Sequence, residues 1–208
     1  MAYTIEEVKK DVSLLTPHDF FVKYILRSDN WYFETCIGNS KEESIRITDD
    51  FKTIVSHSLD ISFNNIAIVG SSKIGCSLSP NSKKLFRKFQ LESDIDVAII
   101  SNKLFHMYWD LFRISYSQVN KRLYDHISRA IYRGYINEKD LTIIDGCRKQ
   151  WNEKASISKK TLRNELYIKQ EITYRLYRSW EDFEEYHIQS LNDIALTINA
   201  LSDNRREK

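Results

Sequence analysis

A pair of carboxylates that follows a strand ending in Gly-Ser is the sequence feature that most limits how this chain can fold. The apolar run 66–69 leads directly into Gly70 and Ser71, and Asp94 and Asp96 open a second apolar run further along. Side chains two residues apart on a strand point to the same face, so both acids are expected to project together. The residues between and after them are expected to enter the core: Ile95, Val97 and Ile99. This pattern predicts a sheet whose edge presents two oxygen ligands suited to a divalent cation.

The remaining patterns predict helices around that sheet. Helix starts are indicated at Thr16-Pro17, at Ser40 with Glu43 three residues on, and at Ser179. The helix from Ser40 is expected to run to about Leu59. Helical spacing continues through 104–135 as one or two helices, 137–160 is typical of a turn and a helix, and 172–177 alternates as a strand. The predicted fold class is therefore α/β (α+β), a small mixed sheet flanked by helices with additional C-terminal helices.

The length and punctuation of the chain favour one main domain. Its 208 residues, 42% hydrophobic and 12% aromatic, are enough to bury a core, and two prolines and five glycines leave no Gly/Ser linker. We expect an N-terminal helical and aromatic extension over 1–39, the main domain with its helical additions over 40–202, and a flexible tail over 203–208. The stretch 78–91, with its basic part 83–88, is expected to be a surface loop or a half-ordered flap.

Charge and cysteine usage indicate the cellular compartment of the chain but do not identify a binding partner. Lys and Arg number 31 against 29 Asp and Glu, and this balance neither demands nor excludes a nucleic acid. Cys36, Cys76 and Cys147 show no spacing typical of a zinc site or a disulfide framework, which favours a reducing compartment. The start of the chain is charged rather than apolar, and no run has the length to span a bilayer. We therefore expect a cytoplasmic protein with no membrane partner.

The two motifs together resemble a known family. Gly70-Ser71-Ser72-Lys73-Ile74-Gly75, followed by Ser93-Asp94-Ile95-Asp96-Val97, is similar to the nucleotidyltransferase domain of the DNA polymerase β superfamily. The similarity is greatest to its minimal bacterial members and to its toxin–antitoxin or phage-defence members. It covers the range 66–100 and, by order, the preceding helix. The resemblance implies Mg²⁺, or Mn²⁺ in its place, an NTP substrate, and transfer of a nucleoside monophosphate to a hydroxyl of RNA, a protein or a small molecule.

The resemblance also implies roles for individual residues. Gly70, Ser71, Lys73 and Ser93 would contact the nucleotide, and Asp94 and Asp96 would be the catalytic, metal-binding acids. Elementary chemistry agrees, because glycine lets backbone N–H groups approach phosphate oxygens without a Cβ in the way. Carboxylate-bound Mg²⁺ bridges phosphate oxygens and lowers the pKa of an attacking hydroxyl.

The chain departs from the family at the third carboxylate, which active members carry on the neighbouring strand. The strand expected at 172–177 offers Thr173 and Arg175 on the relevant face. Asp145 would supply the acid if 141–145 were a strand, and Asp140 is a weaker candidate. Arg175 would otherwise bind a nucleotide phosphate, so the alternative is a catalytically degenerate module that binds a nucleotide or a partner protein.

Other readings of these residues stay open. Gly70 can be an ordinary strand-end turn, with Asp94 and Asp96 on the solvent side of an edge strand. The aromatic and arginine residues of 174–180 suit base stacking, although packing is the more common role of such residues. No histidine or cysteine shows the spacing of a metal site or a nucleophile. An assembly role for the helices of 104–135 is a third function class.

Overall fold

The computed structural model describes residues 3–38, 40–81, 83–117 and 121–206; the side chains of Asp145 and of residues 201–206 lie outside this description. Contacts divide the chain into two units that interleave in sequence. Unit 1 comprises Met1–Thr48, Ile68–Ile95 and Glu184–Lys208, and unit 2 comprises Asp49–Ala67 and Asp96–Phe183. The boundaries expected after residues 39 and 202 do not coincide with this division.

Unit 1 begins with short helices that bury aromatic side chains. They are α1 (Ile5–Leu14), α2 (Pro17–Phe21) and the π-helical turns η1 (Val22–Leu26) and η2 (Phe33–Ile37). The predicted cap is present, since the Thr16 side chain accepts a hydrogen bond from the Asp19 N–H (3.1 Å). A capping box that the sequence analysis did not use starts α1, with Thr4 and Glu7 bonded reciprocally. The buried residues of these turns include Phe20, Phe21, Tyr24, Tyr32 and Phe33.

The strand and turn predictions hold closely in the middle of the chain. Helix α3 (Lys41–Leu59) starts where Ser40 Oγ accepts from the Glu43 N–H (3.1 Å), as expected. After the 3-10 turn η3 (Phe63–Asn65), β1 (Ile66–Val69) leads into α4 (Gly70–Ile74), and β2 (Ile95–Ile100) follows a long loop. Ile95, Val97 and Ile99 are all buried, as predicted.

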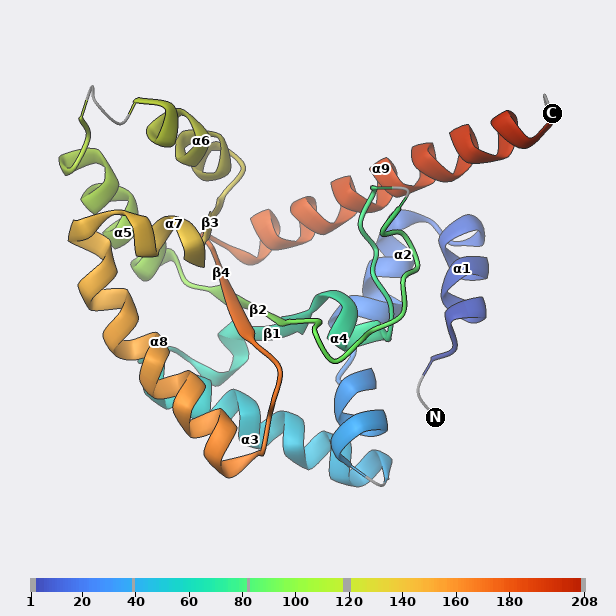
Figure 1. Ribbon diagram of the computed structural model, residues 1–208, viewed down its shortest axis with the longest axis horizontal. Helices are drawn as coiled ribbons and strands as arrows, with labels where there is room; N and C mark the ends of the chain where they lie inside the picture. The colour runs from blue at the N-terminus through green and yellow to red at the C-terminus, as the bar shows by residue number, and fades with distance from the viewer. Residues whose placement is uncertain (1–2, 39, 82, 118–120, 207–208) are drawn as a thin grey trace. The chain divides into compact units, whose positions relative to one another are not determined.

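Unit 2 packs its helices against its own strands. Its elements are α5 (Asn102–Ile114), α6 (Lys121–Tyr132), β3 (Tyr135–Asn137), α7 (Glu138–Ile143), α8 (Asp145–Glu165) and β4 (Ile172–Tyr177). The Trp151 ring of α8 lies edge-on to Tyr108 of α5 (5.8 Å between centroids) and to Tyr174 of β4 (5.7 Å). Figure 1 shows α5, α7 and α8 gathered beside β4, and α8 contacts both other helices. This aromatic layer covers the buried face of β4.

Within the described residues, four strands form one sheet in the order β1-β2-β4-β3. β3 and β4 are antiparallel, with Tyr135 opposite Tyr177 and Asn137 opposite Arg175. The strand predicted at 172–177 is present with those bounds, whereas β3, only three residues long, was not predicted. The predicted α/β (α+β) class is confirmed.

The last helix, α9 (Trp180–Arg206), begins at the predicted Ser179, whose Oγ accepts from the Asp182 N–H (3.2 Å). The helix continues past residue 202, where a flexible tail was expected to begin. Residues 207 and 208 of that tail lie outside the described residues. None of the helices described combines the length and the apolar character needed to cross a membrane.

Candidate functional site

The Gly-Ser turn forms where β1 ends and α4 begins. Gly70 has φ of 70°, a left-handed value that glycine adopts without steric cost. Ser71 is half-buried, and Ser72 is buried with its hydroxyl donating to the Val69 carbonyl (3.2 Å). The sharp turn therefore depends on glycine at position 70 and is anchored from within by Ser72.

Lys73 lies in a place that its expected role does not explain. The side chain is only 4% exposed, and its ammonium donates to the backbone carbonyls of Arg27 and Asp29. Both carbonyls lie between η1 and η2, so Lys73 ties α4 to the segment that joins these two turns. The structure thus gives this lysine a packing role in unit 1.

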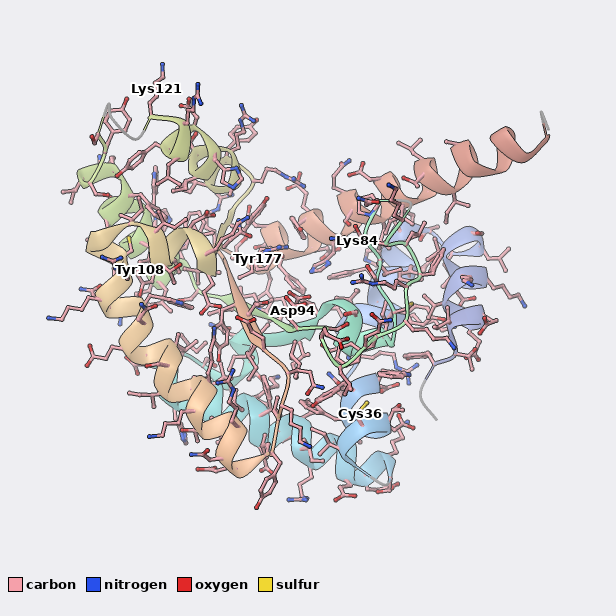
Figure 2. The ribbon with its side chains drawn as sticks, in the orientation of Figure 1. Cys36, Lys84, Asp94, Tyr108, Lys121 and Tyr177 are labelled. Carbon is pink, nitrogen blue, oxygen red and sulfur yellow. The ribbon has the colours of Figure 1, made fainter. Side chains whose placement is uncertain are left out.

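The loop between α4 and β2 contains the stretch 78–91, which was expected to be a surface loop or a half-ordered flap. Backbone hydrogen bonds join its two sides. Its two sides pair through Ser77 and Arg87 (N–H to carbonyl, 2.9 Å), and the Phe89 N–H returns to the Gly75 carbonyl (2.9 Å). Four basic side chains of this loop are exposed, one of which, Lys84, is labelled in Figure 2. They are Lys83, Lys84, Arg87 and Lys88.

Ser93 and Asp94 close this loop just before β2. Ser93 Oγ accepts from the Gln90 N–H (3.0 Å), and the Ser93 N–H bonds to the Gln90 carbonyl (3.0 Å), so this serine closes a turn. Asp94 is exposed and precedes the first strand residue, Ile95. Figure 2 labels Asp94 at this point of the chain. Gly70, Ser71, Ser93 and Asp94 all belong to unit 1.

Asp96, the second acid, is half-buried on β2 in unit 2. Its Oδ1 accepts a hydrogen bond from Thr173 Oγ1 on β4 (3.0 Å). Since β4 is the neighbour of β2 in the sheet, Thr173 occupies the place beside Asp96 that a third carboxylate would need. The expectation that Thr173 and Arg175 share the alternate face of this strand agrees with their half-buried state between buried neighbours.

Neither candidate for the third acid lies on a strand. The segment predicted as a possible strand around 141–145 is the end of α7 and the start of α8. Asp140 is buried and accepts from Asn137 Nδ2 (3.0 Å), and the side chain of Asp145 lies outside the described residues. Across the part of the chain that the structure describes, no three His, Cys, Asp or Glu side chains gather as a metal-binding cluster.

Arg175 of β4 contacts two residues of β3. Its Nε donates to Asn137 Oδ1 (3.2 Å), and its guanidinium lies 5.2 Å from the centroid of the Tyr135 ring. The ring of Tyr135 is also approached by Arg133, at 5.8 Å. The sequence analysis missed Tyr135 and Asn137 because a three-residue strand leaves no readable alternation.

Burial accounts for two of the three cysteines. Cys76 and Cys147 are buried, and desolvation raises the pKa of each thiol to about 11. A thiol with such a pKa is almost wholly protonated at neutral pH and is a poor nucleophile. Cys36 is exposed, and partial burial also raises the pKa of its thiol.

Comparisons with protein-family models, with curated proteins and with solved structures found no match to this chain.

Proposed function

We propose that the chain is a Mg²⁺-dependent nucleotidyltransferase that moves a nucleoside monophosphate from an NTP to a hydroxyl. One observation carries this proposal: the residue after β1 is a glycine with left-handed φ, and β2, the neighbour of β1 in the sheet, begins between the two acids.

The donor set suits magnesium. Mg²⁺ is commonly held by one or two carboxylates together with waters and substrate phosphates, so Asp94 and Asp96 suffice as protein ligands. Asp94 is exposed and Asp96 half-buried, and the hydrogen bond from Thr173 orients the Asp96 carboxylate. When bound, the cation would neutralise phosphate charge and lower the pKa of the acceptor hydroxyl.

The turn supplies the nucleotide contacts. Backbone N–H groups at Gly70 and the Ser71 hydroxyl would donate to the phosphate oxygens of the NTP. The acceptor oxygen then attacks the α-phosphorus in line, the bond to the β-phosphate bridging oxygen breaks, and pyrophosphate leaves. The proton of the acceptor hydroxyl passes to water. Asp94 and Asp96 keep the reacting phosphate in place by holding its cation.

A specific observation favours a second candidate function. The residue that contacts Asp96 from the neighbouring strand is a threonine and not an acid. A catalytically degenerate module with this arrangement would bind a nucleotide, or a partner protein, without transferring anything. The presence of Thr173 in place of an acid is therefore the observation that favours a binding module over an active enzyme.

The biological setting belongs to the same proposal. A role in a toxin–antitoxin pair or in phage defence, and a cytoplasmic location, follow from the resemblance of the two motifs and from the isolated thiols. RNA or a partner protein would then be the natural target. A change in cell growth or phage resistance on expression of the chain, absent with Asp94→Asn/Asp96→Asn, is the expected result.

Transfer is tested with NTPs labelled at the α-phosphate and three separate acceptor pools: cellular RNA, protein and small molecules. The proposal predicts Mg²⁺-dependent label in at least one pool, together with pyrophosphate release. Saturable NTP binding without label in any pool would favour the binding module instead. Absence of both binding and transfer would contradict both candidates.

A further inference from the structure

The exposed side of α6 carries a stripe of cations in unit 2. Its cations are Arg122, Arg129 and Arg133, and His126 lies between the first two; the four follow one another at spacings of four, three and four residues, which places them on one helical face. All four are exposed. Arg133 follows the last residue of α6, yet its N–H still bonds to the Arg129 carbonyl (3.3 Å), so it continues the face.

Little negative charge from α6 itself offsets this stripe. Asp125 is the single acid in the sequence of α6, against the cations Lys121, Arg122 and Arg129. Figure 2 labels Lys121 at the start of the helix, where nitrogen-bearing side chains stand out from the ribbon. Tyr132, 89% exposed, adds an aromatic ring next to the stripe. The apolar face of the helix is turned inward, with Ile127 and Ala130 buried.

The stripe continues onto the half-buried residues of β3 and β4. Helix α6 contacts β3, where the Tyr135 ring lies near the guanidinium groups of both Arg133 and Arg175. A ring that attracts two cations lowers the cost of holding them close together. Asn137, opposite Arg175 in the register, also receives its Nε–H. Arg175 is therefore held in place within this cationic surface.

The surface ends next to an acid of the candidate site. Arg175 and Thr173 are two residues apart on β4, so they share a face at a separation of about 7 Å. Thr173 donates to Asp96. A row of side chains within unit 2 thus leads from α6 through Tyr135 and Arg175 to Asp96.

We propose that this row, the α6 track (Arg122, Arg129, Arg133, Tyr135 and Arg175), binds single-stranded RNA and that RNA is the acceptor of the transfer reaction. Only the second part, that RNA is the acceptor, rests on the proposed function; RNA binding by the α6 track does not. Successive phosphates complement a line of cations, and guanidinium groups and tyrosine rings offer planes on which unpaired bases stack. An anionic membrane is the less suitable ligand, because the apolar face of α6 is buried in the protein and cannot enter lipid.

RNA binding is measured without NTP, by the fluorescence anisotropy of a labelled single-stranded RNA of mixed sequence mixed with the full chain. The test variant is Arg122→Gln/Arg129→Gln. The matched control is Lys160→Gln/Arg163→Gln, which removes the same charge from exposed positions of α8. Thermal unfolding of each variant verifies that it is folded.

The α6 variant is expected to bind RNA roughly tenfold more weakly or worse, and the control within about threefold of the wild type. The slope of log affinity against log salt should fall by about 1.4 in the α6 variant, since each lost phosphate contact on a single strand contributes about 0.7. Arg175→Gln should weaken binding as well. Equal losses in the two double variants, no RNA binding by the wild type, or tight binding to anionic vesicles in place of RNA would overturn the inference.

The reaction gives an independent readout. With RNA as acceptor, Arg122→Gln/Arg129→Gln should raise the KM for RNA and leave the KM for NTP unchanged. Transfer to another acceptor without RNA binding would refute the α6 track and leave the proposed function standing. RNA binding that is intact in an inactive protein would refute the transferase and leave the track.

Discussion

At the scale of single residues, burial decides what a charged or flexible side chain does. Lys73 sits in the motif that resembles a phosphate-binding turn, yet its ammonium is occupied by two backbone carbonyls of unit 1. Gly75, at the other end of the same motif, has φ of 85° and lies against the Trp31 ring. Both residues pack within unit 1, and the predicted contact of Lys73 with the nucleotide stays a prediction.

Lys73→Met keeps the apolar stem of the side chain and removes its donors. Two backbone carbonyls then lose the donor that the buried ammonium supplies, and the free energy of unfolding should fall by about 1–3 kcal/mol. Urea denaturation measures the change, with the exposed Lys88→Met as a control expected to stay within about 0.5 kcal/mol. A Lys73→Met protein of normal stability that no longer binds NTP would show that Lys73 is a phosphate ligand after all.

Gly75→Ala and Gly146→Ala form a matched pair of substitutions. A Cβ on Gly75 would lie 2.7 Å from Trp31 Nε1 and would be held at a positive φ, so unfolding should become easier by about 1–3 kcal/mol. Gly146, in the first turn of α8, has no atom within 4 Å of such a Cβ. Alanine there should leave stability unchanged or raise it by up to about 1 kcal/mol. Equal effects of the two substitutions, measured by thermal unfolding, would contradict this packing.

At the scale of elements, local signals in the sequence were sufficient to predict two helix starts and one strand. Ser40 and Ser179 were predicted as helix starts from capping chemistry, and both bond as expected. Strand 172–177 was predicted from its alternation. The ends of α7 and α8 and the short β3 could not be predicted, because tertiary packing and pairing with β4 decide them.

Ser179→Ala tests the cap of α9. The substitution removes the acceptor of the Asp182 N–H and should lower the free energy of unfolding by about 1 kcal/mol. Ser156→Ala, at an exposed position in α8, is the control and should change little. A cap substitution without any measurable cost would mean that the Asp182 side chain and its neighbours hold the helix start alone.

Thr173→Asp tests the relation between β2 and β4. Without a divalent cation, the new carboxylate faces Asp96, and repulsion should lower the melting temperature. Mg²⁺ should then raise the melting temperature of this variant by more than that of the wild type, since three acids hold the cation better than two. Thr173→Val, which removes only the hydrogen bond, should show no such response. If Mg²⁺ did not change the melting temperature of Thr173→Asp, the side chains at positions 96 and 173 would not share a metal.

At the scale of the whole molecule, the class of the fold and the two motifs could be predicted from the sequence. The contacts that the motif residues make with other elements could not. The sequence already predicted Thr173 and Arg175, and no acid, on the relevant face of strand 172–177, and the structure adds that Thr173 is the residue that bonds to Asp96. The formal charge of +2 concealed the uneven distribution of charge, because the stripe on α6 becomes apparent only when exposure is known. Interleaved units also lie beyond what patterns along a chain can reveal.

The dependence of nucleotide transfer on the paired acids tests the central claim most directly. Label from an α-phosphate-labelled NTP is followed in the wild type, in Asp94→Asn/Asp96→Asn, and in Asp110→Asn, an exposed acid of α5 that pairs with Arg113. We predict Mg²⁺-dependent transfer that falls at least about 100-fold in the double variant and is unchanged in Asp110→Asn. Transfer that persists without the two carboxylates would contradict the account.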